Sequence, residues 1–337
     1  MKSLLGFAAI VTASALHAQG VGKPILDMHM HAMAISEFGK EPPEVCIAAE
    51  GAEMHGTDPA QPFDFKAQAS CKRMAKAPAT DEALIAETLR MMDRYNIVTG
   101  MLEGDPPILA KWKKAAPDRF LLGRHFFVDD NRPPVSQVAV LEAAAKRGEI
   151  QLFAEVAPQY RGFGPDDSSL EPFYAMAERL DVPVGIHMGY GAPGGPYWIY
   201  PKYRAALNNP LLLEDLLVRH PKMRVYVMHA GMPMVDEMIM VMNAHPQVFL
   251  DIAADNWGVP RKEFHFILKR LVDAGYGKRI MFGSDQMMWP ATIPVAIASI
   301  TEADFLTAEQ KRDIFYNNAA RFLRLSPAEI ARHHQRQ

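Results

Sequence analysis

The sequence has no long basic run and, beyond its first residues, no long apolar run. Its 337 residues carry a formal net charge of −3, and Lys and Arg occur only singly or in short pairs. This excludes a general nucleic-acid binder, because such proteins gather positive charge against the phosphates. No segment reaches the ~18 consecutive apolar residues of a membrane-spanning helix. We therefore expect no nucleic-acid partner and no membrane span.

The first eighteen residues predict a removable leader. Lys2 supplies a positive start, Leu4–Ala15 is apolar, and Leu16-His17-Ala18 offers a small-residue cleavage site before Gln19. This is the pattern of a signal peptide. The alternative is a buried N-terminal helix. We expect residues 1–18 to be removed and the mature protein to be exported, to the periplasm.

Cysteine is scarce, with Cys46 and Cys71 as the only two. An exported protein enters an oxidising compartment, where cysteines pair. A disulfide between them would close a loop of about 25 residues and contribute roughly 3 kcal/mol if it is unstrained. Two free thiols are the alternative, because the sequence does not determine the distance between the side chains.

Short apolar runs alternate with longer amphipathic segments. Each run is almost continuously apolar, as expected for strands buried on both faces. The predicted strands are Ile25–His31, Ile97–Glu103, Phe120–Val128, Leu152–Ala157, Pro183–Met188, Arg224–His229, Val248–Ile252 and Arg279–Ser284. The predicted helices are Asp81–Tyr95 after an N-cap at Thr80, Ser136–Arg147, Leu170–Leu180, Pro210–His220, Met234–His245, Lys262–Ala274 and Thr307–Leu325.

This alternation predicts an α/β fold, a parallel sheet that closes into a (β/α)8 TIM barrel. The alternative is an open doubly wound sheet, which would normally place a glycine-rich phosphate turn after the first strand. The first strand ends in His-Met-His instead, and no internal repeat is present. We therefore predict one barrel domain over residues 19–325.

Two connections are unusually long. Residues 32–79 form an insertion after the first strand, which predicts a lid-like segment at the C-terminal face of the barrel. Residues 189–209 follow the fifth strand and carry Tyr197 and Trp198. Residues 326–337 are rich in His, Gln and Arg, and we predict a frayed C-terminal tail.

Ionisable side chains recur at the ends of the predicted strands, where barrel enzymes carry their catalytic groups. His29 and His31 have the period of two that turns both imidazoles to one face. A single His in an apolar run is more often a hydrogen-bonded core residue. A whole set at one barrel mouth is costly to bury unless it is paired or binds metal. The set predicts a divalent-metal site with nitrogen and oxygen donors, and its other members are His187, His229, Asp285 and, within the fourth strand, Glu155.

Four motifs resemble the successive strand motifs of the amidohydrolase superfamily. They are Ile-Leu-Asp-Met-His-Met-His, Gly-Ile-His-Met, Val-Met-His-Ala-Gly-Met and Met-Phe-Gly-Ser-Asp-Gln, and Tyr316–Leu323 is similar to a closing helix of the same proteins. The resemblance covers nearly all of Ile25–Leu325. It is nearest to the amidohydrolase-related branch that includes aminocarboxymuconate semialdehyde decarboxylase. It implies a distorted (β/α)8 barrel with one or two metal ions.

The resemblance also implies a role for each residue. His29, His31 and His187 would bind metal, and Asp285 would bind it weakly and act as general base on the metal-activated water. His229 would polarise the substrate or bind a second metal. The ion expected is Zn²⁺, with Mn²⁺ as the alternative.

Glu155 leaves the number of metals open. Some binuclear members of the superfamily have a bridging carboxylate on the fourth strand, and Ala154-Glu155-Val156 resembles that segment. As a bridge, Glu155 would assign His187 and His229 to a second metal. Alternatively, it orients a ligand imidazole through a hydrogen bond.

Three further residues are candidates for substrate binding: Arg161, Trp198 and Trp257. Arg161 could hold a carboxylate by two hydrogen bonds, although a solvated loop arginine is the simpler explanation. Trp198 and Trp257 could form an apolar wall, although aromatic residues in loops are often simply packed.

Three functions remain from the sequence. The first is hydrolysis of an amide, ester or lactone bond in a small organic substrate. The second is metal-dependent non-oxidative decarboxylation of an aromatic or unsaturated acid, which members of the resembling branch catalyse. The third is a metal- or ligand-binding protein without turnover, which the presence of both His229 and Asp285 disfavours. The sequence leaves open the substrate and whether the chain forms a homo-oligomer.

Overall fold

The computed structural model describes residues 22–39, 41, 44–124 and 134–336. The predicted leader, residues 1–18, lies outside the described residues, as does the end of the third predicted strand. No helix among the described residues is long and apolar enough to cross a membrane.

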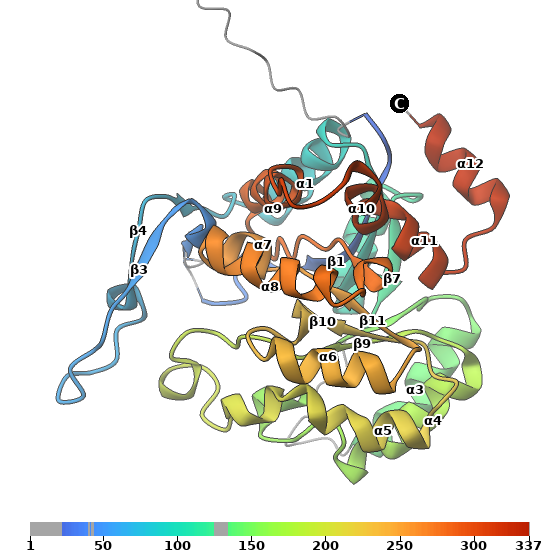
Figure 1. The fold of residues 1–337 in the computed structure, drawn as a ribbon, viewed down its shortest axis with the longest axis horizontal. Helices are drawn as coiled ribbons and strands as arrows, with labels where there is room; N and C mark the ends of the chain where they lie inside the picture. Colours follow the sequence, from blue (N-terminus) through green and yellow to red (C-terminus); the bar gives the residue numbers. More distant parts are fainter. Residues whose placement is uncertain (1–21, 40, 42–43, 125–133, 337) are drawn as a thin grey trace, which may run out of the picture.

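All eight predicted strands are present, and they lie in two parallel sheets of order β1-β6-β7 and β12-β11-β10-β9-β8. Residue Gly123 pairs with Leu152, and Met28 N–H donates to the Phe282 carbonyl over 2.9 Å, so the two sheets join at both edges into a ring. This is the predicted TIM barrel (Figure 1). The strands are β1 (Ile25–Ala32), β6 (Ile97–Gly104), β7 (Phe120–Gly123), β8 (Phe153–Val156), β9 (Val184–His187), β10 (Val225–Met228), β11 (Val248–Asp251) and β12 (Ile280–Met281).

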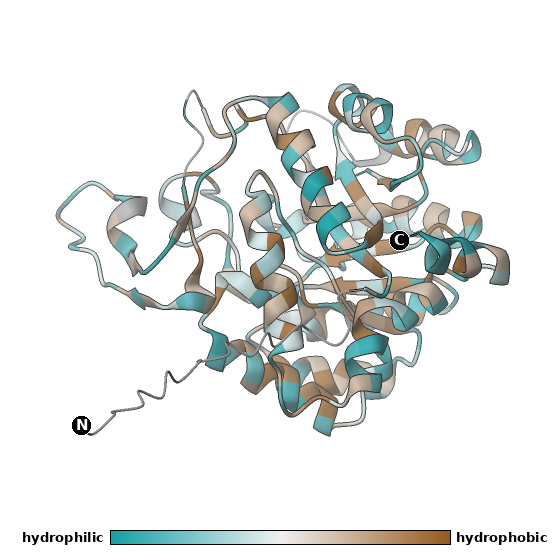
Figure 2. Ribbon diagram, turned by 90° about the horizontal axis from the view of Figure 1, so that it is seen from above, coloured by the Kyte–Doolittle hydropathy of each residue, from teal (hydrophilic) through white to brown (hydrophobic). Residues whose placement is uncertain are grey.

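Two apolar cores explain why the strands are almost continuously hydrophobic. The inner core fills the barrel with side chains from alternate strand positions, such as Leu26, Val98 and Tyr226. The outer core lies between the strands and the helices, and Ile25 and Ile97 belong to it. A strand buried on both faces needs apolar residues at odd and even positions alike. Figure 2 accordingly shows brown apolar segments on the central strands and mixed colours along the surrounding helices.

The helices follow the predicted rhythm with small shifts at their ends. Thr80 caps α1 as predicted, because its side chain accepts the Ala83 N–H. Three barrel helices were not predicted, α2, α7 and α9, and the segment 210–220 divides into a 3-10 turn and a short α-helix. The helices around the barrel are α1 (Asp81–Arg94), α2 (Pro106–Ala115), α3 (Pro134–Lys146), α4 (Glu171–Leu180), α5 (Glu214–Arg219), α6 (Val235–Ala244), α7 (Asp255–Gly258), α8 (Arg261–Asp273) and α9 (Ile293–Thr301).

The C-terminal region differs more from prediction. The single helix predicted over Thr307–Leu325 is interrupted by a π-helical turn at Asp313–Asn317, which separates α10 (Ala308–Arg312) from α11 (Asn318–Phe322). The side chains of Tyr316 and Phe322 pack in the inner core. This segment therefore covers one end of the barrel interior.

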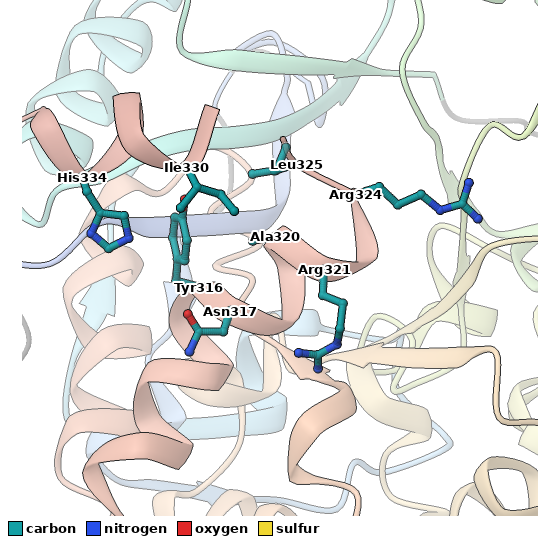
Figure 3. A pocket seen from close by; sticks show the side chains of 8 residues that line it. All are labelled: Tyr316, Asn317, Ala320, Arg321, Arg324, Leu325, Ile330 and His334. Atoms are coloured by element: carbon teal, nitrogen blue, oxygen red, sulfur yellow. The ribbon is translucent and has the colours of Figure 1, made fainter. Parts of the chain in front are cut away.

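The prediction of a frayed tail is wrong, because residues 327–335 form helix α12 (Pro327–Gln335). A capping box holds its first turn: Ser326 accepts the Glu329 N–H, and Glu329 accepts the Ser326 N–H. His333 hydrogen-bonds to the Tyr316 hydroxyl over 3.0 Å. A groove of about 500 Å³ lies between α11 and α12 and is lined by Tyr316; Figure 3 shows the side chains around it.

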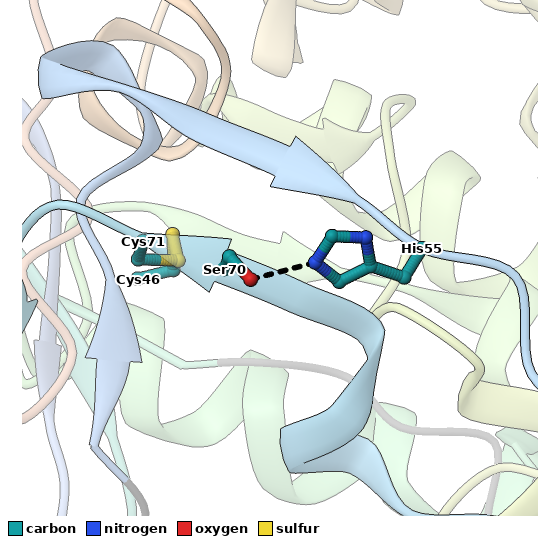
Figure 4. Close-up of a disulfide and its surroundings, with 4 residues drawn as sticks. All are labelled: Cys46, His55, Ser70 and Cys71. Carbon is teal, nitrogen blue, oxygen red and sulfur yellow. Dashed lines mark hydrogen bonds between the residues drawn. A yellow bond between two sulfur atoms is a disulfide. The ribbon is translucent and has the colours of Figure 1, made fainter.

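The insertion after β1 forms an arm of two small antiparallel sheets. Strand β2 (Val45–Cys46) pairs with β5 (Met74–Ala75), and β3 (Ala52–Met54) pairs with β4 (Ala69–Cys71). The Cys46–Cys71 disulfide, with 5.7 Å between the Cα atoms, joins the two sheets (Figure 4). The pair is therefore not two free thiols.

The β3–β4 part of the arm extends away from the barrel (Figure 1). It contacts the second long connection through Phe63 and Tyr197, whose ring centroids lie 5.9 Å apart. The lid-like function of the insertion stays a prediction.

We predict that Cys46→Ser loosens the arm without unfolding the barrel. The disulfide closes a loop with a sequence separation of 25, so its loss should reduce the local stability of the arm by up to roughly 3 kcal/mol. Limited proteolysis should then cut within residues 47–70 while the barrel stays intact. The Cys71→Ser variant and reduced wild-type protein should behave alike, and unchanged protease resistance would contradict the prediction.

Candidate metal centre

The two histidines of the first strand reach the barrel mouth because β1 is irregular. The register of β1 against β6 shifts between Asp27 and Met30. Such a bulge turns a side chain to a face that strict alternation would deny it. Met28 packs in the inner core and Met30 in the outer core. His29 and His31 face one another, with 3.1 Å between their Nε2 atoms, so the predicted shared face is confirmed.

Asp285 completes a first group of donor atoms. It follows β12, and its Oδ1 lies 2.8 Å from Nε2 of His31 and 3.8 Å from Nε2 of His29. All three side chains are buried, and their donor atoms lie within 4.8 Å of one another. Two imidazole nitrogens and a carboxylate oxygen in this arrangement match a divalent-metal site.

Glu155 lies between this group and two further imidazoles. Its Oε2 is 3.9 Å from Nε2 of His29 and 3.8 Å from Nε2 of His31. Its Oε1 contacts Nδ1 of His187 and lies 3.1 Å from Nε2 of His229. His29, Glu155 and His229 form a second group whose donor atoms lie within 4.8 Å. The structure thus brings together all six residues that the sequence predicts for the metal site.

Each imidazole has a partner on the ring nitrogen that faces away from Glu155. Such outer partners fix the tautomer and the orientation of a metal-binding histidine. Glu103 contacts Nδ1 of His31, and Asp251 Oδ2 lies 3.1 Å from Nδ1 of His29. The remaining two pairs are His229 Nδ1 with the Ala253 carbonyl at 3.0 Å and His187 Nε2 with the Tyr160 hydroxyl at 3.4 Å.

The charges of the site keep its carboxylates ionised. Burial by itself would raise the pKa of Asp285, but His29 and its neighbours lower this pKa to about 2. Burial would also raise the pKa of Glu155, but His187 and His229 hold it well below its usual value. Burial would lower the pKa of His229, yet Glu155 raises it to about 10. A cation that binds here must displace protons from imidazoles, so its affinity should rise with pH.

The backbone at the mouth adopts conformations that L-residues rarely occupy. His229, Ala254 and Asp285, which follow β10, β11 and β12, have φ angles of 62°, 56° and 46°. Such conformations cost of order 1–3 kcal/mol each and gather at active sites. Gly283 allows close approach, because a Cβ there would lie 2.7 Å from the Cβ of His29.

Hydrogen bonds between β1 and the segment after β12 hold the first donor group in place. Asp27 Oδ1 accepts the N–H groups of Ser284 at 2.9 Å and of His29 at 3.1 Å. The Gln286 side chain accepts the His31 N–H at 3.2 Å and donates to the His31 carbonyl at 2.8 Å. The residues on both sides of Asp285 are therefore tied to the strand that carries the two histidines.

The three predicted substrate-binding residues lie around the centre in different settings. Trp257 is buried, and its indole N–H donates to the Ser284 carbonyl at 2.7 Å, so it supports the Asp285 segment. Trp198 is 40% exposed and donates to the Pro193 carbonyl at 3.0 Å. Arg161 is exposed. A substrate-binding role for these three stays a prediction.

Sequence reasoning missed Glu103, Asp251 and Tyr160. Glu103 and Asp251 lie at or beside the ends of β6 and β11, which is the signal that identified the histidines. The sequence does not single out the two acids, because neither lies in one of the four motifs on which the resemblance rests. Tyr160 lies in a 3-10 turn after β8, and no sequence pattern indicates its contact with His187.

The model of the amidohydrolase family matches residues 26–325, and the chain belongs to this family. The fold, the match and the donor groups together define a metal-dependent enzyme. No curated protein sequence matches the chain.

Solved structures similar to this chain carry several activities in their names. The 4-oxalomesaconate hydratase of Rhodopseudomonas palustris is 16% identical, with a TM-score of 0.57 over 93% of this chain and 100% of that one. A structure described as a 2-pyrone-4,6-dicarboxylic acid hydrolase of Acinetobacter baumannii is 14% identical, with a TM-score of 0.56 over 89% and 99%. The 5-carboxyvanillate decarboxylase of Novosphingobium aromaticivorans, complexed with manganese, is 14% identical, with a TM-score of 0.50 over 70% and 79%. At these identities the likeness establishes the fold.

We predict that Asp251→Asn weakens metal binding by about 10- to 100-fold, the usual cost of losing an outer partner of a ligand. The amide nitrogen that replaces one carboxylate oxygen cannot accept a hydrogen bond from His29. Competition with a chelator would measure the affinity. Asp273→Asn, which changes an exposed acid paired with Lys269, is the matched control. Equal affinities in the two variants would refute an orienting role for Asp251.

Proposed function

We propose that this protein is a two-metal hydrolase that cleaves an amide, ester or lactone bond in a small organic substrate. The observation that carries the proposal is the position of Glu155. One of its oxygens lies 3.8 Å from Nε2 of His31, and the other lies 3.1 Å from Nε2 of His229. A carboxylate between two imidazole pairs is suited to bridge two cations. Paired cations about 3.5–4 Å apart stabilise both the attacking and the leaving oxygen of a displacement.

The donor atoms fit such ions. The Nε2 atoms of His29 and His31 face each other at 3.1 Å while their Nδ1 atoms have carboxylate partners. The outer partners hold a proton on Nδ1 and leave the Nε2 lone pairs for a cation. Nitrogen and oxygen donors suit Zn²⁺ and Mn²⁺, and the similar decarboxylase holds manganese. In this proposal one ion would be held by His29, His31 and Asp285 and the other by His187 and His229, and Glu155 would contribute to both sites.

When bound, the ions supply Lewis acidity that brings the pKa of a water molecule toward ~7. Asp285 then accepts a proton from the attacking water, because its carboxylate stays ionised beside the first imidazole pair. Asp285 later returns this proton to the leaving group. Glu155 and the imidazoles hold the charge around the reacting atoms without transferring protons themselves.

Carboxylated substrates belong in the search for the natural one. The three similar structures are named for 4-oxalomesaconate, 2-pyrone-4,6-dicarboxylic acid and 5-carboxyvanillate, which are all carboxylic acids. A panel should therefore contain lactones, esters and amides with and without a carboxylate. Arg161 is the residue that we propose for a substrate carboxylate.

We predict that the wild-type protein binds two Zn²⁺ or Mn²⁺ ions per chain and hydrolyses a member of this panel, and that a chelator abolishes the activity. Glu155→Gln should lose one ion, because an amide cannot bridge two cations with two anionic oxygens, and should lower kcat by about 100-fold or more. Elemental analysis and kinetics on the same preparations would measure both effects.

A matched control is Glu178→Gln, which disrupts a similar acid–imidazole contact on the outer helices. There Oε2 of Glu178 lies 3.1 Å from Nδ1 of His220. The control variant should leave metal content and activity unchanged. Release of carbon dioxide from a substrate would identify the reaction as decarboxylation and overturn the hydrolase proposal. Full activity of the Asp285→Asn variant would overturn the role of Asp285 as the base.

We also propose that the protein is exported to the periplasm. The leader pattern of residues 1–18 and the Cys46–Cys71 disulfide support this, because disulfides persist in oxidising compartments. Deleting residues 2–18 should therefore keep the protein in the cytoplasm with both cysteines reduced. Cell fractionation and thiol alkylation would measure this, and export of the shortened chain would contradict it.

A further inference from the structure

Tyr160 differs from the other outer partners of the four imidazoles. Glu103, Asp251 and the Ala253 carbonyl present only acceptor oxygens to their histidines at a pH where the acids are ionised. A phenol hydroxyl accepts one hydrogen bond and still has a proton to donate. Tyr160, the partner of His187, can therefore donate a hydrogen bond to a further molecule, whereas the other three partners cannot.

Neighbouring aromatic rings hold Tyr160 beside the candidate metal centre. It lies in the 3-10 turn η3 (Pro158–Arg161), directly after the strand that carries Glu155. Its ring centroid lies 4.4 Å from that of Tyr200 and 5.0 Å from that of His187. Tyr203 stacks on it as well, at 5.6 Å. Tyr160 is nevertheless partly exposed, so a molecule in the barrel mouth can reach it.

The orientation of His187 determines which proton is free. Its Nδ1 faces Glu155, so Nδ1 would be the nitrogen that holds a cation, and with that cation bound the neutral ring would carry its proton on Nε2. That N–H would then donate to the Tyr160 oxygen, 3.4 Å away. Within residues 22–39, 41, 44–124 and 134–336, this is the only hydrogen bond of the Tyr160 hydroxyl. Its own proton is therefore available to a substrate.

We infer that the Tyr160 hydroxyl donates a hydrogen bond to the carbonyl oxygen of the substrate while negative charge develops on it. This inference rests on the proposed hydrolysis. As the water oxygen bonds to the carbonyl carbon, the electron pair of the C=O π bond moves to the carbonyl oxygen, and Asp285 takes the water proton. The Tyr160 proton is shared and not transferred. The bond to the leaving group then breaks, and Asp285 protonates that group.

The test compares Tyr160→Phe with wild-type protein, both loaded with Co²⁺. The variant keeps the stacked ring and removes only the hydroxyl. Loss of one donor to such an oxygen lowers kcat by about 10²–10³-fold, and we expect a much smaller change in KM. The Co²⁺ content and the visible Co²⁺ spectrum should stay unchanged. Tyr174→Phe, which removes a buried hydroxyl from α4, should behave as wild type.

A second readout does not require turnover. Methylphosphonate is a tetrahedral anion and resembles the tetrahedral, negatively charged species that forms when water adds to the carbonyl carbon. Its Kd can be measured from the Co²⁺ spectrum. Tyr160→Phe should raise this Kd by about 10-fold or more, the usual effect of one hydrogen bond to a charged group. If wild-type protein hydrolyses nothing but this shift is found, the proposed function fails and the donor role of Tyr160 stands.

Three results would overturn the inference. In the first, Tyr160→Phe keeps the wild-type kcat and methylphosphonate Kd. In the second, the variant loses Co²⁺ or changes its spectrum, which would make Tyr160 a positioning residue for His187. In the third, wild-type protein does not bind methylphosphonate at all.

Discussion

The burial of charge at one end of the barrel is the constraint on which the rest of the structure depends. Four imidazoles and three acids of this centre are nearly inaccessible to water, among them His29, Asp251 and Asp285. An unpaired buried charge costs several kcal/mol, so each group needs a partner of opposite sign or a cation. Glu155 provides this for two imidazole pairs at once. The site is therefore a network in which changing one member alters the charge balance of the others.

The geometry of the strands follows from this network. A regular β1 would alternate its side chains strictly, and the register shift before Met30 allows both histidines and Met28 to face inward. A second register shift in β8, between Phe153 and Val156, surrounds Glu155. Residues with positive φ, His229, Ala254 and Asp285, follow β10, β11 and β12. The irregularities thus coincide with the functional side chains, as expected where strain serves function.

The local pattern of the sequence predicted most of the elements but not all of their boundaries. Strands buried on both faces are easy to recognise, and all eight were found. Helix α9 was not, because it is apolar on nearly every side and has no polar face to mark its period. The polar composition of residues 326–337 predicts a tail, although Ser326 and Glu329 carry the capping pattern of helix α12. The sequence predicts a lid-like insertion over residues 32–79 but not the strands of the arm, because these strands are only two or three residues long.

By itself, the sequence predicted the barrel and the six side chains of the candidate metal centre, because strand periodicity and strand-end positions are local properties of the chain, and its motifs indicated the amidohydrolase family. Only the tertiary structure decided what lies opposite each of those side chains. Glu103, Asp251 and Tyr160 belong to strands and turns distant in sequence from the histidines that they contact, and distance in space cannot be read from separation along the chain. The tertiary structure likewise decided the position of Glu155 between two imidazole pairs. It arises when strands one, four, five and six close into a ring.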